Sequence, residues 1–201
     1  SDLRKELVKY YKSNLTLDQA VALQHGLKFK PQIQRTPGKW EDATTSEIKN
    51  AMNSSKLAKD PTQKYQFLRL DKSQNISGTD LDKLLVGKGI LEGQGEAFSE
   101  AAKTYNINEV YLVSHALLET GNGTSKLANG GDVVNNKIVT NGAKKYYNMF
   151  GIGAVDKDPV KQGFATAKNN GWDTVKKAIV GGAKFIANSY INQGQNTLYK
   201  M

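Results

Sequence analysis

The segment from Val110 to Thr120 carries a single acidic side chain in a setting that suits acid catalysis. Its residues are apolar almost all round, which is typical of a helix buried in the middle of a fold. Glu119 stands in the last turn, where apolar neighbours and the negative end of the helix dipole favour the protonated acid over the carboxylate. Such an acid can donate a proton to the leaving oxygen of a sugar. Glu119 is therefore the candidate catalytic general acid.

Glu119 also has a plainer interpretation. A glutamate in a last turn can cap its helix or pair with a lysine such as Lys126. The Gly121-Asn122-Gly123 turn that follows favours the catalytic interpretation, because small residues let a bulky ligand approach the backbone. His115 lies one turn earlier on the same face, and a lone histidine without a partner is more often structural than a ligand.

Few acids are available to share a two-carboxylate mechanism with Glu119. No glutamate follows it, and the later acids are Asp132, Asp156, Asp158 and Asp173. Asp173 resembles a helix cap, Asp156 and Asp158 lie in a predicted turn, and Asp132 lies at the mouth of a predicted hairpin. The partner must be Asp132, Asp156, Asp158 or an acid from the first half. The alternative is a single acid assisted by the substrate itself.

A cluster of residues suited to sugar binding follows the catalytic candidate. It combines paired aromatic rings, an amide and a glycine in Tyr146, Tyr147, Asn148, Phe150 and Gly151. Aromatic faces stack on sugars and amides bind acetamido groups. The alternative is a β-strand whose aromatic side chains fill core space, and the sequence leaves both open. Together with Asn122 and Asp132, these residues form the candidate substrate-binding set.

Helices must hold the candidate acid in place. Apolar residues at helical spacing predict a helix over 95–105. Asn106 with Glu109 three places on predicts the start of the helix that carries Glu119. Gly121 is expected to end that helix in the left-handed conformation.

The rest of the second half should be a small β lobe and a last helix. Asn-Asn and Asn-Gly pairs between β-branched runs predict a hairpin over 133–142. Asp173 or Thr174 is expected to cap a final helix that reaches Tyr190.

The first ninety residues form shorter predicted elements with polar joints. Thr16 and Gln19 form a capping-box pair at the start of a short helix. Residues 28–40 contain two prolines and are expected to be extended. The remaining predictions are a helix over 46–57, a short strand or extended stretch over 65–70 and one or two helical turns over 80–85.

Composition narrows the chemistry. The chain has no cysteine and only two histidines, His25 and His115, which excludes thiol catalysis and makes zinc or Ser–His–Asp chemistry a poor interpretation. We expect no metal and no cofactor. The net charge of +9, with eleven lysines against four aspartates from Thr120 onward, implies an anionic partner. No apolar run is long enough to cross a bilayer.

Two motifs resemble those of a known family. Ser114 to Ser125, with the sequence SHALLETGNGTS, resembles the active-site signature of glycoside hydrolase family 73, and more narrowly the glucosaminidase modules of staphylococcal-type autolysins. Tyr146 to Gly151 resembles the Tyr-Asn-x-Phe-Gly motif of that family. Further similarity runs through 65–70, 87–98 and 172–201.

The resemblance implies a mainly helical α+β fold of the lysozyme-like kind, with two lobes, a small β lobe and a glycan-binding groove. It implies hydrolysis of the β-1,4 bond between N-acetylglucosamine and N-acetylmuramic acid, with Glu119 as the catalytic glutamate. Tyr147, Asn148 and Phe150 fall on the second motif. Family members continue past the position of Met201 into a Tyr-Ala-Thr-Asp segment, so the resemblance also implies that part of the site is missing here.

Organisation, partners and location follow from the same resemblance. Residues 1–90 are expected to pack, as a helical and extended region, on a catalytic core of residues 91–201. The expected partners are peptidoglycan glycan strands and anionic cell-wall polymers. We expect a monomer outside the cell, in the wall or at the outer face of the cytoplasmic membrane. A membrane or partner-protein tether upstream of Ser1 stays open.

Three other functions compete with the hydrolase. A lytic transglycosylase shares the fold and the single glutamate but forms an anhydro-sugar instead of adding water. A non-catalytic module that binds the wall or a partner fits the early end of the chain and its surface charge. A nucleic-acid binder fits the charge alone, and no nucleic-acid motif supports it.

Overall fold

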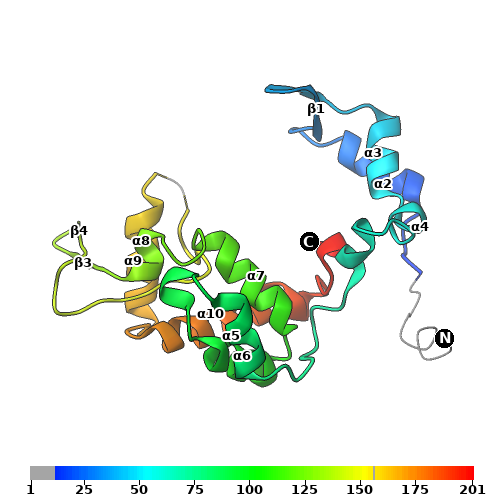
Figure 1. The fold of residues 1–201 in the computed structure, drawn as a ribbon. Helices are drawn as coiled ribbons and strands as arrows, with labels where there is room; N and C mark the ends of the chain where they lie inside the picture. The colour runs from blue at the N-terminus through cyan, green and yellow to red at the C-terminus, as the bar shows by residue number, and fades with distance from the viewer. Residues whose placement is uncertain (1–11, 156) are drawn as a thin grey trace. The chain divides into compact units, whose positions relative to one another are not determined.

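The computed structural model describes residues 12–155 and 157–201, and the chain divides into two compact units after Tyr65 (Figure 1). The first unit holds a small core of Val21, Ala43 and Ile48. Residues 66–90, which the sequence placed with the N-terminal region, belong here to the second unit. The packing of residues 1–90 on a core of residues 91–201 stays a prediction.

The first unit is a helix, a hairpin and two short helices. Thr16 and Gln19 form the predicted capping box at the start of the first of these helices. The predicted extended stretch is an antiparallel hairpin, in which the register shifts between Gln34 and Thr36. The predicted helix over 46–57 is interrupted at Asn53, whose side chain caps the second piece. The elements are α2 (Leu17–His25), β1 (Gln32–Thr36), β2 (Lys39–Asp42), α3 (Thr45–Met52) and α4 (Ser54–Leu57).

The second unit contains the longer helices and a second two-stranded sheet. The mainly helical α+β class is therefore confirmed. Its elements are α5 (Gly78–Leu85), α6 (Gly95–Tyr105), α7 (Glu109–Glu119), α8 (Lys126–Asn129), β3 (Asp132–Val134), β4 (Lys137–Val139), α9 (Pro159–Asn169) and α10 (Val175–Ser189). The single-turn 3₁₀ elements are η1 (Gln63–Phe67), which begins in the first unit, η2 (Gly89–Leu91), η3 (Ile191–Gln193) and η4 (Leu198–Lys200).

This unit has two lobes. Helices α5, α6, α7 and α10 pack together in one, and the β3–β4 hairpin lies with α8 and α9 in the other (Figure 1). The hairpin turns at Asn135 and Asn136, which both have positive φ angles, as a type I′ turn requires. The hairpin predicted over 133–142 is confirmed, with its paired residues at 132–134 and 137–139.

Helix α7 is the central helix of the second unit. It buries Leu112, Val113 and Ala116 completely or almost completely, as the apolar sequence predicts. Its first residue, Glu109, is also fully buried, and its carboxylate accepts hydrogen bonds from the Ser73 hydroxyl and the Gln74 backbone N–H. Buried charges need such partners. The segment before α5 is thereby tied to the start of α7.

Two predictions about this unit are wrong. The helix start lies two residues after the predicted Asn106: Asn106 ends α6 in the left-handed conformation, and the Asn108 side chain caps α7. The strand predicted over 65–70 is a 3₁₀ turn followed by irregular chain. The backbone N–H of Leu70 donates to the Asn196 carbonyl and its carbonyl accepts from the Asn108 N–H, so it pairs with loops rather than a strand.

Helix α10 presents two adjacent glycines to the core. Thr174 caps this helix, as predicted. A side chain at Gly181 would collide with the indole of Trp172, and one at Gly182 would collide with the ring of Phe150. Both aromatic rings therefore lie directly against the α10 backbone. Phe150 is thereby fixed in place from the α10 side.

We expect Gly182→Ala to destabilise the protein. The new Cβ would lie 2.8 Å from Phe150 Cε2 and closer still to Cδ2, so the ring must move in a close-packed core. Overpacking of this kind costs about 1–3 kcal/mol of unfolding free energy. Denaturant unfolding measures the loss, and Lys184→Ala, at an exposed position of the same helix, serves as control. Equal midpoints for Gly182→Ala and wild type would contradict this packing.

Candidate active site

Glu119 ends α7 and its carboxyl group meets the backbone of Gly151. A Cβ at Gly151 would lie 2.9 Å from Glu119 Oε2, and Gly151 has a φ angle of +63°. Both facts favour glycine, because other residues rarely adopt this conformation and would crowd the carboxyl group. The structure thus brings together the two motifs that the sequence singled out. The Glu119 side chain is 41% exposed, so the apolar neighbours expected around it leave the carboxyl group open to solvent.

His115 lies beside the carboxyl group on the same face of α7. Its Nε2 is 3.8 Å from Glu119 Oε1, and its ring lies between those of Tyr111 and Phe150, with centroids 5.6 and 5.5 Å away. Burial lowers the pKa of His115 below its ordinary value, while the charge of Glu119 acts in the opposite direction. The imidazole is therefore neutral at neutral pH.

The turn after Glu119 is held from inside the protein. The Thr120 hydroxyl is buried, donates to the Ala116 carbonyl at 2.6 Å and accepts from the Gly123 N–H at 2.8 Å. A side chain at Gly123 would collide with the Lys88 carbonyl, so this glycine is required by packing between two loops. Asn122, between the two glycines, has an exposed side chain. The Asn122 side chain is therefore accessible to a ligand.

Asn148 is buried and its amide is used within the protein. Only 2% of the residue is exposed. Its Nδ2 donates to the carbonyls of Ile152 and Gly163, at 2.8 and 3.1 Å, and its Oδ1 accepts from the backbone N–H groups of Phe150 and Ile152. These bonds fold the loop that presents Gly151 to Glu119. This geometry does not support a direct contact between Asn148 and an acetamido group.

The two tyrosines are half-buried, so each packs against the protein and keeps part of its side chain accessible to solvent. Tyr147 packs over Gly130, where a Cβ would lie 2.7 Å from its ring, and its N–H donates to the Trp172 carbonyl at 2.9 Å. Tyr146 pairs its backbone with that of Gly131. Phe150, at 5% exposed, is a core residue.

Asp132 forms an ion pair that links the hairpin to α9. Lys168 Nζ lies 2.8 Å from Asp132 Oδ1 and 5.8 Å from the centroid of the Tyr146 ring. The hydrogen bond from Lys168 holds the pKa of Asp132 below its ordinary range, and a bond from the Val133 N–H adds to the effect. Asp132 is therefore a carboxylate at neutral pH. Lys168 was not among the predicted site residues, because helix α9 was not predicted.

The other late aspartates have structural partners. Asp158 caps α9 by accepting from the Lys161 N–H, followed by Pro159 at the first helical position, so the predicted turn is a helix start. Asp173 pairs with Lys177 at 2.7 Å. Asp156 lies outside the described residues. Neither Asp158 nor Asp173 is free to act as a base.

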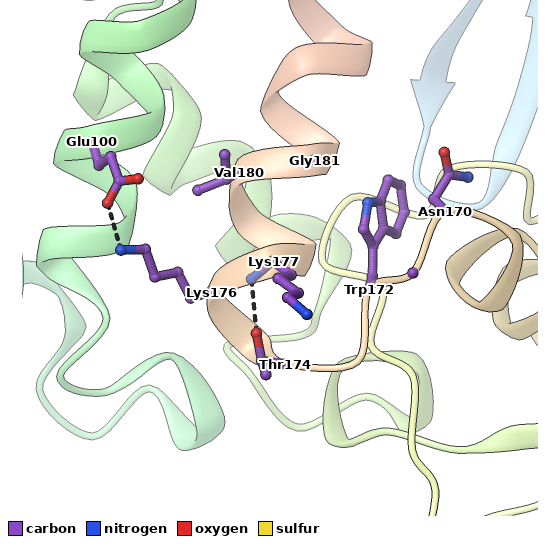
Figure 2. A pocket seen from close by; sticks show the side chains of 9 residues that line it. Glu100, Asn170, Trp172, Thr174, Lys176, Lys177, Val180 and Gly181 are labelled. Carbon is purple, nitrogen blue, oxygen red and sulfur yellow. Dashed lines mark hydrogen bonds and ion pairs between the residues drawn. The ribbon is translucent and has the colours of Figure 1, made fainter.

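Two shallow hollows lie along α10, away from these residues. The larger, of about 600 Å³, is lined by residues that include Trp172, Val180 and Gly181, and the smaller, of about 230 Å³, shares Trp172 and Gly181. Figure 2 shows Lys176 bound to Glu100 at the rim of the larger one, at 2.6 Å. Neither hollow includes Glu119, and we do not assign either as the catalytic site.

The described part of the chain shows no group of three His, Asp or Glu side chains placed to hold a metal ion. In the same residues, no helix has the length and the apolar character needed to cross a membrane.

Comparisons with known proteins show which proteins this chain is similar to. The chain is 62% identical over its 201 residues to the bifunctional autolysin of Staphylococcus aureus strain N315, and spans 16% of that protein. The crystal structure of the major bifunctional autolysin superposes with a TM-score of 0.79 at 58% identity, over 97% of this chain and 79% of that one. A catalytic glutamate-to-alanine mutant of S. aureus autolysin E, solved with the disaccharide NAG-NAM, superposes at 0.66 with 38% identity, over 93% and 77%.

These similarities place the chain among proteins with the lysozyme-like α+β fold of the autolysin structures. Residues 95–201 match the glucosaminidase family model, described as mannosyl-glycoprotein endo-beta-N-acetylglucosaminidase. The chain belongs to this glucosaminidase family.

We expect Lys168→Met to destabilise the protein in a pH-dependent way. The pKa of Asp132 is lowered in the folded state, so the pair contributes stability above the pKa of an unfolded aspartate, about 4. That contribution disappears as the pH falls through the lowered folded pKa. Denaturant unfolding should show a deficit at pH 7 that shrinks towards pH 3, whereas Lys126→Met, at an exposed position, should match wild type. A deficit that does not change with pH would contradict the ion pair.

Proposed function

We propose that this chain hydrolyses peptidoglycan at the β-1,4 bond between N-acetylglucosamine and N-acetylmuramic acid, with Glu119 as the general acid. The observation that carries the proposal is the solvent-accessible carboxyl group of Glu119, set between His115 Nε2 and the Gly151 backbone. Autolysin E supports it, since it was solved with NAG-NAM as a catalytic mutant and with a NAM-L-Ala-D-iGlu muropeptide.

The proposed reaction uses one protein acid. Glu119 gives its proton to the oxygen that links the two sugars, and the bond from that oxygen to C1 of N-acetylglucosamine breaks. Water then adds to C1 and gives a proton back to the Glu119 carboxylate, which restores the acid. Asp132 is a weak base because Lys168 stabilises its carboxylate. Asp158 and Asp173 have structural partners. These contacts favour assistance from the acetamido group of the substrate itself over a second protein carboxylate.

Different residues of the candidate set would act at different distances from the sugar. Tyr146 and Tyr147 keep part of their rings accessible and Asn122 is exposed, so we assign these three to direct contact. A second group would not touch the sugar but would hold the loop in place against Glu119; it consists of Phe150, Asn148 and Gly151. Asp132, through Lys168, would hold Tyr146 in place.

Charge supports a second kind of partner. The net charge of +9 attracts anionic polymers of the cell wall, which would hold the protein near its substrate. A peptidoglycan substrate also implies that the protein works outside the cell, in the wall or at the outer face of the membrane. We propose that it acts as a monomer.

Mass spectrometry of the muropeptides released from purified peptidoglycan tests this function. Hydrolysis at the proposed bond leaves N-acetylglucosamine at the new reducing end. Anhydro-sugar products would assign the chain to the lytic transglycosylases instead. Absence of any soluble product from folded protein would favour a non-catalytic wall-binding role.

We expect Glu119→Gln to abolish hydrolysis and leave the fold intact. Glutamine keeps the shape of the side chain but has no acidic proton, and a general acid contributes about 100- to 10,000-fold to a rate. Dye release from labelled cell walls measures the loss, with circular dichroism to check folding. Glu100→Gln, at an exposed position of α6, should retain wild-type activity. Near wild-type turnover by Glu119→Gln would rule out this acid.

A further inference from the structure

The position of His115 costs the protein stability, which suggests that the imidazole has a function. Its side chain is 23% exposed, and its Nδ1 is buried without a hydrogen-bond partner in the described residues. A buried polar atom left without a partner costs about 1–3 kcal/mol. Among the described residues, Nδ1 is the one buried side-chain nitrogen or oxygen that has no hydrogen-bond partner. A phenylalanine would avoid the cost and keep the contacts with Tyr111 and Phe150.

The other ring nitrogen of His115, Nε2, lies beside the carboxyl group of Glu119. His115 and Glu119 are four residues apart on α7, where side chains are neighbours. Nε2 faces Glu119 Oε1 at 3.8 Å, while Gly151 lies at Oε2. The separation is longer than a hydrogen bond, as catalytic pairs often are before substrate tightens them. Each oxygen of the carboxyl group therefore has its own neighbour.

The surroundings of the His115 ring determine which of its two nitrogens carries the proton. Buried N–H groups without acceptors are rarer than buried acceptors without donors, so the bare lone pair belongs on Nδ1 and the proton on Nε2. Burial lowers the pKa of His115, which keeps the ring neutral. Phe150 brings no charge, and burial raises the pKa of Tyr111, so its hydroxyl is neutral too. Glu119 is the acidic neighbour that the described residues place against the ring.

We propose that His115 is a positioning residue for Glu119: its Nε2–H holds Oε1, so that Oε2 carries the proton delivered to the sugar. The inference rests on the proposed function and deepens it. The same N–H stabilises the carboxylate that Glu119 becomes once the proton has left. Tyr111 and Phe150 hold the imidazole, and the loop that carries Phe150 also carries Gly151.

Two substitutions separate this role from packing. His115→Phe keeps a ring between Tyr111 and Phe150 but has no nitrogen, whereas His115→Gln places an amide near the position of Nε2. We expect kcat on peptidoglycan fragments to fall about 10- to 100-fold in His115→Phe, with KM within about twofold, because a misplaced catalytic group costs rate. His115→Gln should recover part of kcat. Equal kcat in His115→Phe and wild type overturns the proposal.

A titration gives a readout that needs no activity. The chain has two histidines, so the His115→Phe spectrum assigns the His115 ring signals by difference. Because the charge of Glu119 raises the pKa of His115, Glu119→Gln should move the His115 midpoint to lower pH. An unmoved midpoint overturns the proposal. If wild type releases no muropeptides but the midpoint moves, the proposed function fails and the His115–Glu119 coupling stands.

Discussion

The close approach of Glu119 Oε2 to the Gly151 backbone is the contact on which the rest of the site depends. Burial fixes both partners. Helix α7 is held by its apolar face, with Leu112 and Ala116 fully buried, so its last residue has little freedom of position. The Gly151 loop is folded around the buried amide of Asn148. A carboxyl group placed in this way is positioned before substrate arrives, which is what proton transfer requires.

The two lobes contribute different properties to the site. The helical lobe supplies the acid on a buried helix, and its α10 glycine, Gly182, lets Phe150 reach His115. The β lobe contributes solvent-accessible surface. The ion pair between Asp132 and Lys168 joins the hairpin to α9 and places a cation near the Tyr146 ring. In the proposed mechanism, protonation and sugar contact therefore belong to separate packed regions.

Local signals in the sequence predicted much of this arrangement. The capping box at Thr16, the Thr174 cap and the Asn-Asn turn act over a few residues, so their structures follow from their own chemistry. Features that depend on contacts between residues far apart in the sequence could not be predicted from such local signals. The exposure of Glu119 depends on what covers the end of α7, and the burial of Asn148 depends on carbonyls up to fifteen residues away. The pattern over 65–70 suggested a strand or extended stretch, but in the part of the chain that the structure describes Leu70 pairs its backbone with Asn108 and Asn196 instead of a strand.

The rate at which the Gly151→Ala variant cleaves peptidoglycan tests the contact between Glu119 and Gly151 most directly. The substitution brings a methyl group 2.9 Å from Glu119 Oε2 at a φ angle of +63°. Gly87→Ala is the matched control, because Gly87 has a φ angle of +69° and nothing within 4 Å of the added carbon. Both variants carry similar backbone strain, of order 1 kcal/mol. We predict that both fold, that Gly87→Ala cleaves peptidoglycan like wild type, and that Gly151→Ala loses about 100-fold or more in kcat. Equal cleavage by the two variants would contradict the account.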